Sequence, residues 1–329
     1  MSGILTFCGF NSLQFGDLVI NTFAARVLKE KYPTSKLTFV INKDYKDIAP
    51  LFINHPHIDY IKILDKNRDG FNKVDQDWVK NQDFDLVFNP MQDHDYSDPW
   101  FLKRHQAAEV CFMHRLADEK ECEKFDNKLY LNKWFDIIPF TTKYIAFAPF
   151  PGFYNKNNDK TLTIEKAQKI VYYLTNLGFG VLQVGGPDEP KLCQTLKIDR
   201  SDYFTSIKDM LACQFLICGD SGINWVSSAY EFPTIGLYSN KYYGEKFVKN
   251  IQPINPNAEY LDADNVNNIP DQEIFAVIDR MVDEYVKLAQ IELARSNEPD
   301  TLKYKTWEHQ MKVDLEVLKN RLKLLEQYK

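Results

Sequence analysis

The 329-residue chain contains no apolar run long enough to cross a bilayer, which takes about 20 residues. Its start lacks both a basic segment and a small-residue cleavage site, so no secretory signal peptide is expected. Six cysteines occur without a C-x-x-C pair and without the Cys/His spacing of a zinc site. Cys213 and Cys218 lie in a very apolar stretch, which predicts buried free thiols. We therefore expect a reduced, cytoplasmic protein with no metal and at most peripheral membrane contact.

An excess of positive charge is also missing. Lys and Arg total 40 and Asp and Glu total 46, which gives a net charge of −6. A chain of this charge is not expected to bind nucleic acid, so any basic site must be local. Hydrophobic residues at 44% and charged residues at 26% are typical of globular proteins and exclude disorder along the whole chain.

What is present is a pattern of strands alternating with helices, and this pattern occurs twice. The first half predicts strands at 4–7, 37–41, 60–64 and 86–88, with a helix at 18–32. The second predicts strands at 144–148, 180–184, 215–218 and 234–238, and helices at 163–177, 206–213 and 222–230. Such alternation indicates doubly wound α/β domains with parallel sheets. Ligands are expected at a cleft between the domains, beyond the carboxyl ends of the strands.

We place the two α/β domains at residues 1–142 and 143–295, followed by a helical extension at 296–329. In the extension, apolar residues recur in steps of four and three, as in a short coiled coil: Met311, Leu315, Leu318, Leu322 and Leu325. This stripe either packs on the protein's own body or joins two copies into a homodimer. The sequence leaves both alternatives open.

The first candidate for chemistry is Asp17, in Phe15-Gly16-Asp17-Leu18 at the start of the first predicted helix. A helix N-terminus favours an ionised carboxylate, as a general base requires. A simple helix cap is the alternative.

The second half holds three further candidates that each follow a predicted strand. Lys160 lies in a loop and is suited to hold a phosphate. Gly185 and Gly186 allow a backbone to approach a ligand closely, and Glu189 can accept hydrogen bonds from ribose hydroxyls. Asp220-Ser221-Gly222 runs into a helix, whose first N–H groups form an anion site for a diphosphate. The alternatives are a solvated lysine, an ordinary turn and a capped helix.

Taken together, these motifs resemble the family 9 glycosyltransferases, which include the ADP-heptose:lipopolysaccharide heptosyltransferases. The first half contributes Gly16-Asp17-Leu18, the segment from Ala25 to Pro33, and His55-Pro56-His57-Ile58-Asp59. The second half contributes Ala148-Pro149-Phe150-Pro151-Gly152, Lys160-Thr161-Leu162, Gly185-Gly186-Pro187-Asp188-Glu189, Asp220-Ser221-Gly222 and Ser227-Ser228-Ala229-Tyr230-Glu231-Phe232-Pro233. The motifs occur in the family's order over about residues 3–290.

The resemblance implies a GT-B fold, in which two facing Rossmann-like domains bind a nucleotide-sugar donor and a glycan acceptor. It implies inverting, metal-independent transfer of a sugar from a nucleotide diphosphate, which acts as co-substrate, with no other cofactor. By position, Asp17 matches the base, Lys160 a phosphate contact and Glu189 a ribose contact. Asp220-Ser221-Gly222 matches the diphosphate loop.

Two residues depart from the family pattern. Trp225 stands where the family has histidine, and Leu162 stands where it has tryptophan. Trp225 either stacks on the donor's base or sugar or packs inside the protein. These departures motivate a second hypothesis, a non-catalytic nucleotide- or glycan-binding protein that acts through its C-terminal helix. A third hypothesis, a Rossmann oxidoreductase, is poorly supported because no G-x-G-x-x-G follows the first strand.

Candidates for the acceptor side lie in the first domain. Asp93-His94-Asp95 follows a predicted strand, and we assign Asp93 and Asp95 to an acceptor-side loop, with metal binding by the D-x-D triplet as the alternative. Lys103, Arg104, His105 and Arg115 form a local basic group suited to a phosphorylated or acidic acceptor. A solvated helix face is the alternative for this group.

Overall fold

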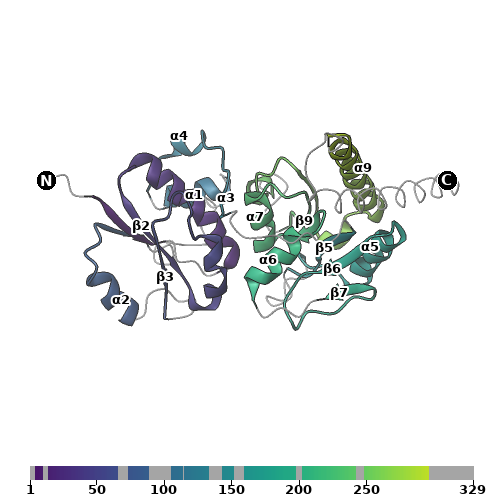
Figure 1. Ribbon diagram of the computed structural model, residues 1–329, viewed down its shortest axis with the longest axis horizontal. Helices are drawn as coiled ribbons and strands as arrows, with labels where there is room; N and C mark the ends of the chain where they lie inside the picture. The colour runs from purple at the N-terminus through teal and green to yellow at the C-terminus, as the bar shows by residue number, and fades with distance from the viewer. Residues whose placement is uncertain are drawn as a thin grey trace.

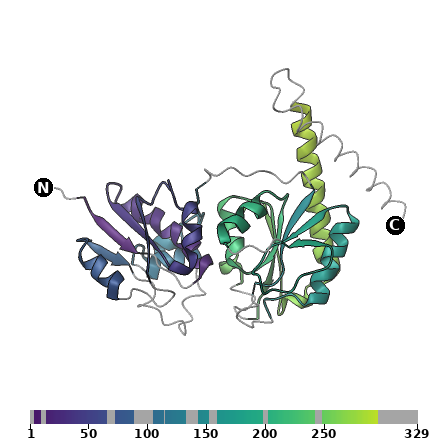
Figure 2. The same cartoon turned by 60° about the horizontal axis from the view of Figure 1, so that its bottom comes forward.

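The computed structural model describes residues 4–9, 14–65, 73–88, 105–113, 115–132, 143–151, 159–197, 202–241 and 248–295, with side chains described up to residue 284. These residues form two α/β units, each built around its own parallel sheet (Figures 1 and 2). The first unit covers residues up to 132 and the second begins at 143. The predicted boundary at 142 and 143 falls beside residues outside the described ranges and stays a prediction.

The first sheet has the order β3-β2-β1-β4, and every pair of neighbours is parallel. Its strands are β1 (Thr6–Gly9), β2 (Lys36–Ile41), β3 (Tyr60–Ile63) and β4 (Leu86–Phe88). The helices of this unit are α1 (Phe15–Lys31), η1 (Lys43–Leu51), α2 (Lys73–Lys80), α3 (Gln106–Met113) and α4 (Glu119–Cys122). The first strand begins two residues later than predicted. Ile4 and Leu5 are exposed there, whereas Phe7 and Cys8 are buried.

The second sheet has the order β10-β9-β8-β5-β6-β7 and is also entirely parallel among its described strands. Its strands are β5 (Tyr144–Ala148), β6 (Gly180–Gln183), β7 (Thr195–Lys197), β8 (Leu216–Gly219), β9 (Thr234–Ser239) and β10 (Ala258–Ala263). The helices are α5 (Ile164–Asn176), α6 (Tyr203–Leu211), α7 (Gly222–Ala229), α8 (Val248–Ile251), η3 (Val266–Asn268) and α9 (Asp271–Arg295). This strand order is that of a Rossmann-like doubly wound sheet, so the predicted fold class is confirmed.

Helix α1 explains how the two units meet. Apolar side chains bury it on nearly every side, because it packs against α3 in its own unit and against α7 in the second unit (Figure 1). One hydrophobic cluster therefore runs from Phe15 and Leu18 of α1 to Trp225 and Val226 of α7. The second unit has a further core on its other face, where Tyr173 of α5 stacks on Phe275 of α9 with ring centroids 4.0 Å apart.

Several smaller expectations meet the structure here. Cys213 and Cys218 are buried free thiols, as predicted. Thr163 caps α5 as predicted, since its hydroxyl accepts a hydrogen bond from the Lys166 backbone at 3.2 Å. Within the described residues, no helix combines the length and the apolar character of a membrane span. The helical extension at 296–329 lies outside the described residues, so its packing and the homodimer stay predictions.

Candidate functional site

The order of the strands fixes where a ligand site forms in each unit. In a doubly wound sheet, ligands bind at the carboxyl ends of the two strands where the winding reverses. In the first sheet these strands are β1 and β4, and in the second they are β5 and β8. Asp17 follows β1, Lys160 follows β5 and Asp220 follows β8. Three sequence-predicted residues therefore lie at the reversal points of the two sheets.

Two glycines allow the starts of α1 and α7 to approach each other closely. A Cβ on Gly222 would lie 2.6 Å from Cδ1 of Phe15 and 2.9 Å from the backbone nitrogen of Gly16. A Cβ on Gly16 would lie 3.1 Å from Cα of Gly222. Larger residues at either position would push the helices apart. Gly222 thus has a packing role across the two units besides its predicted place in the diphosphate loop.

Asp17 lies in the first turn of α1 and is partly buried. The pKa of its carboxyl group is raised to about 6, chiefly by burial and also by the nearby Asp220 charge, while a hydrogen bond from the Gln14 backbone opposes the rise. The helix N-terminus was expected to favour the ionised form, but burial outweighs it. With a pKa of about 6, Asp17 is still roughly nine-tenths ionised at pH 7. A carboxylate whose pKa lies this close to neutral pH is suited to act as a general base.

Lys160 forms an ion pair with Asp220, and only 17% and 14% of their side chains are exposed. The loop that carries Lys160 is fixed on both sides. The Asp159 carboxylate accepts hydrogen bonds from Asn265 at 3.0 Å and forms an ion pair with Lys241 at 3.2 Å. Gly219 makes room for Pro151, because a Cβ there would lie 2.6 Å from the proline Cγ. The predicted phosphate-binding lysine is therefore held in place by a carboxylate of the predicted diphosphate loop.

Ser221 is the N-cap residue of α7, but its side chain does not cap the helix. Its hydroxyl instead donates a hydrogen bond to the Gly219 carbonyl at 3.2 Å. Ser221, Gly222 and Ile223 are all partly exposed. The Ser221 hydroxyl therefore leaves the first N–H groups of α7 uncapped, at a helix start that is partly exposed. Such N–H groups are suited to bind an anion.

Gly185, Gly186 and Glu189 form a turn after β6, the strand next to β5. Glu189 folds back over Gly185, so a Cβ at Gly185 would lie 1.9 Å from its carboxylate oxygen Oε2. The turn is closed by a hydrogen bond from the Glu189 N–H to the Gly186 carbonyl at 3.3 Å. The absent side chain of Gly185 therefore sets the position of Glu189, whose contact with a ribose stays a prediction.

Trp225 is 3% exposed and packs where the two units meet. Its indole contacts the His105 ring edge to face, with centroids 5.9 Å apart. Of the two alternatives, this arrangement is packing inside the protein, so the indole offers no open face to a nucleotide. A role of Trp225 in binding the donor stays a prediction, because the two units would have to separate to expose its indole.

His105 differs from its expected place in a solvated basic group. Its Nε2 lies 3.1 Å from the Gln252 carbonyl of the second unit, and its Nδ1 accepts a hydrogen bond from the Ala107 N–H at 3.2 Å. Burial lowers its pKa to about 4, so the ring is neutral at pH 7. His105 therefore fits neither alternative, a basic group for an acidic acceptor or a solvated helix face, because its neutral imidazole bridges the two units.

The remaining acceptor-side candidates, Asp93, Asp95, Lys103 and Arg104, lie outside the described residues and stay predictions. Within the residues that the structure does describe, no group of three or more His, Cys, Asp or Glu side chains gathers as metal ligands would.

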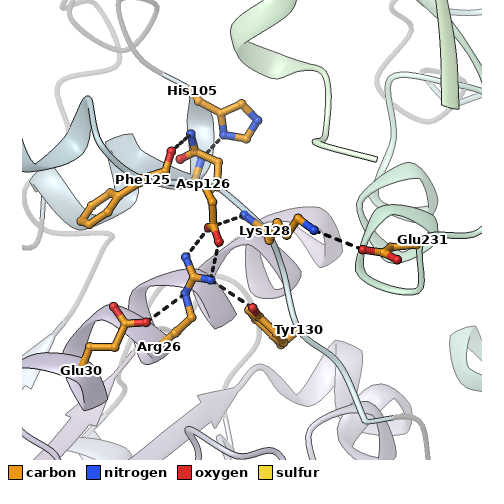
Figure 3. A network of polar contacts seen from close by, with 10 residues as sticks. Arg26, Glu30, His105, Phe125, Asp126, Lys128, Tyr130 and Glu231 are labelled. Atoms are coloured by element: carbon orange, nitrogen blue, oxygen red, sulfur yellow. Dashed lines mark hydrogen bonds and ion pairs between the residues drawn. The ribbon is translucent and has the colours of Figure 1, made fainter. Parts of the chain in front are cut away.

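Sequence reasoning missed a polar network that ties α1 to the segment 125–132 (Figure 3). Arg26 is 7% exposed and bonds to the Asp126 carboxylate, to Tyr130 at 3.2 Å and to Glu30 at 3.6 Å. From the same segment, Lys128 reaches Glu231 of the second unit at 3.4 Å. Apart from Glu30, which lies one turn further along α1, the partners of Arg26 and Lys128 lie about a hundred residues away in the chain, so no local spacing in the sequence signals them.

Comparison with known proteins identifies the fold. No protein-family model and no curated protein matches the sequence. Solved structures do match. A family 9 glycosyltransferase from Veillonella parvula superposes with a TM-score of 0.60 at 15% identity, covering 86% of this chain and 99% of that one. ADP-heptose lipopolysaccharide heptosyltransferase II from E. coli gives 0.62 at 11% identity, covering 85% and 99%.

A third structure, the dodecameric iron-containing heptosyltransferase TibC in complex with ADP-D-β-D-heptose, gives a TM-score of 0.60 at 12% identity and covers 86% of this chain and 79% of that one. Identities this low establish the fold and leave the activity to be tested. The chain therefore has the GT-B fold of the family 9 glycosyltransferases, as its motifs predicted.

Proposed function

We propose that this protein is a glycosyltransferase that moves a sugar from a nucleotide diphosphate to an acceptor hydroxyl. One observation carries the proposal. A half-buried carboxylate with a raised pKa, Asp17, lies at the reversal point of the first sheet, against the Lys160–Asp220 pair and the start of α7 at the reversal point of the second. A base and an anion site from opposite units are the two parts that transfer to a hydroxyl needs.

The chemistry follows from these placements. Asp17 takes the proton of the acceptor hydroxyl, and the acceptor oxygen forms a bond to the anomeric carbon. The bond from that carbon to the diphosphate oxygen breaks, and the diphosphate leaves with the electron pair. Attack from the face opposite the leaving group inverts the anomeric carbon. The Lys160 ammonium and the first N–H groups of α7 stabilise the charge on the departing diphosphate, so these residues supply the role that a metal has in other transferases.

The similar structures indicate which substrates to try first. One was solved with ADP and another with ADP-D-β-D-heptose, and heptosyltransferase II is named for lipopolysaccharide. An ADP-sugar as donor and a lipopolysaccharide-type glycan as acceptor are therefore our first candidates. Because Trp225 replaces the family's histidine, we do not extend the proposal to heptose itself.

The deciding experiment pairs nucleotide sugars of ADP, UDP, GDP and CMP with glycan and lipopolysaccharide acceptors and follows nucleotide release. We expect one nucleotide to be selected. Asp17→Asn should then lower kcat by about 10²- to 10⁴-fold while calorimetry shows that the variant still binds the donor. The control is Asp202→Asn, since Asp202 caps α6 and asparagine caps equally well.

Full activity of Asp17→Asn would reject Asp17 as the base. Nucleotide binding without release from any donor would favour the second hypothesis, a non-catalytic binding protein.

A further inference from the structure

The Lys160–Asp220 ion pair is a feature that the proposed chemistry does not yet explain. Lys160 is needed to stabilise a diphosphate, but its ammonium already lies against the Asp220 carboxylate. Both side chains are mostly buried, with 17% and 14% exposed, so water screens the pair weakly. A diphosphate can engage Lys160 fully only by competing with Asp220 for the same ammonium.

Asp17 is the second carboxylate near this pair. Because the starts of α1 and α7 touch through Gly16 and Gly222, the residue after Gly16 lies close to the residues before Gly222. Asp220 is the charge that raises the pKa of Asp17, besides burial. Like charges at short range each favour protonation of the other.

The charges around Asp17 come from few elements. Helix α7 contributes no titratable side chain, and Tyr203 of α6 contacts Phe15 with ring centroids 5.4 Å apart. The other titratable groups on the elements near the start of α1 are His105, Glu109, Cys111, Lys208 and Asp209. His105 is neutral near pH 6 because burial lowers its pKa to about 4. Among the groups that the structure describes, Asp220 is the one whose charge acts on Asp17.

We propose that Asp220 is a positioning residue that couples occupancy of the diphosphate site to the strength of Asp17 as a base. In the empty site, Asp220 holds Lys160 and Lys160 neutralises Asp220. When a diphosphate draws Lys160 away, the Lys160 ammonium no longer offsets the negative charge of Asp220. Asp17 then feels more of this charge and gains affinity for a proton. Asp17 is therefore the strongest base when the donor is bound. This inference rests on the proposed function, in which Asp17 is the base and Lys160 binds the diphosphate.

The exchange is physically reasonable for a lysine. Its ammonium is a point charge on a flexible four-carbon stem, so it can turn from one anion to another. A diphosphate offers more negative charge than one carboxylate, together with contacts to the first N–H groups of α7. Asp220 in turn keeps Lys160 from remaining an uncompensated, mostly buried cation while the site is empty.

The first test needs no ligand. Selective ¹³C labelling of aspartate follows the titration of Asp17 by NMR in the full chain, and Asp17→Asn assigns the signal. Lys160→Met, which removes the cation paired with Asp220, should raise the titration midpoint by roughly half a pH unit or more, and Asp220→Asn should lower it by a similar amount. Asp271→Asn is the matched control. It removes the carboxylate that pairs with the buried Lys166 at 3.0 Å in the same unit, and it should leave Asp17 unchanged.

The second test uses ADP and inorganic pyrophosphate as probes in calorimetry. Because Lys160 no longer has to leave a carboxylate, Asp220→Asn should bind both probes roughly threefold tighter. The terminal phosphates of both probes also titrate near pH 6.5. Binding at this pH should therefore take up more protons with the unchanged protein than with Asp17→Asn, and the difference is the contribution of Asp17. A residue that only supports the fold, or one that contacts the donor directly, would instead weaken binding when replaced.

The inference is overturned if Asp220→Asn leaves the Asp17 midpoint unmoved or weakens binding of both probes. Because the NMR titration uses the empty protein, its failure is separate from a failure of the proposed function. The latter would appear as no binding of either probe to the unchanged chain.

Discussion

At the scale of single residues, the burial of Asp17 favours the base that we propose but lowers the stability of the fold. Burial that raises its pKa to about 6 makes the folded protein disfavour the charged carboxylate. The unfolded chain ionises the same group at its ordinary value of 3.8. Above pH 6 the folded state therefore holds a charge that the unfolded state would solvate better, which lowers the free energy of unfolding. This cost is typical of a residue retained for catalysis.

Asp17→Asn should consequently stabilise the protein at neutral pH. After allowance for partial exposure, we expect a gain of about 1–2 kcal/mol in the free energy of unfolding at pH 7.5. A raised folded-state pKa is a penalty present above that pKa, so the gain should shrink as the pH falls from about 6 and vanish below 3.8. Urea unfolding of both proteins at pH 7.5, 5 and 3.5 measures it. An equal gain at all three values would mean that the effect does not come from titration of Asp17.

At the scale of elements, α1 carries Asp17 at one end and Arg26 in its middle. Arg26 holds the segment 125–132 through Asp126 and Tyr130 (Figure 3). Its guanidinium also lies 4.6 Å from the centroid of the Phe23 ring. Since the same segment reaches the second unit through Lys128 and Glu231, the position of α1 depends on this network.

Arg26→Met should lower the free energy of unfolding by about 1–3 kcal/mol, because it leaves Asp126 without its buried partner. The matched control on the same helix is Lys31→Met. Lys31 pairs with Glu121 at 3.0 Å, but the side chains are 36% and 44% exposed, so the change should cost less than about 0.5 kcal/mol. Urea unfolding at pH 7.5 compares the two variants. Equal losses would show that burial of Arg26 adds nothing.

The elements also show how far the sequence alone reaches. The apolar runs at 37–41, 144–148 and 234–238 predicted central strands well, because strands covered on both faces are continuously apolar. Edge strands β7 and β10 were missed. The first has three residues, and the second carries Glu259 and Asp262 and is only partly buried. Helix α9 was overlooked although Ile274, Ile278 and Met281 follow a helical spacing.

In the candidate site, the sequence predicted where the candidate residues lie relative to the strands but not how their side chains pair. The positions of Asp17, Lys160 and Asp220 after strands could be read from local pattern. The ion pair of Lys160 with Asp220, the buried Trp225 and the bridging His105 depend on contacts between segments far apart in the chain, which no local period encodes.

At the scale of the whole molecule, the two units share one hydrophobic core. The hydrophobic cluster that includes Phe15 also includes Trp225. Polar contacts surround it: the Tyr230 hydroxyl donates to the Asn132 carbonyl at 2.5 Å, and Asp47 accepts a hydrogen bond from the Tyr203 N–H at the start of α6. The candidate base and the candidate anion site therefore keep their relative positions only while this contact holds.

We expect the units to unfold together for this reason, and Gly222 provides the test. An added Cβ at Gly222 meets Phe15 and the Gly16 backbone, so Gly222→Ala should loosen the contact of α1 with α7 by about 1–3 kcal/mol. Hydrogen exchange should give equal global protection to β2 and β8 in the unchanged protein, and unequal protection in the variant.

The control is Gly180→Ala, whose Cβ would lie 2.5 Å from the Tyr144 ring, a contact within the second unit. It should lower protection in both sheets together, because the contact between the units is intact. Unequal protection of β2 and β8 in the unchanged protein would contradict the shared core. Chemistry by Asp17 would then depend on a ligand to bring the two units together.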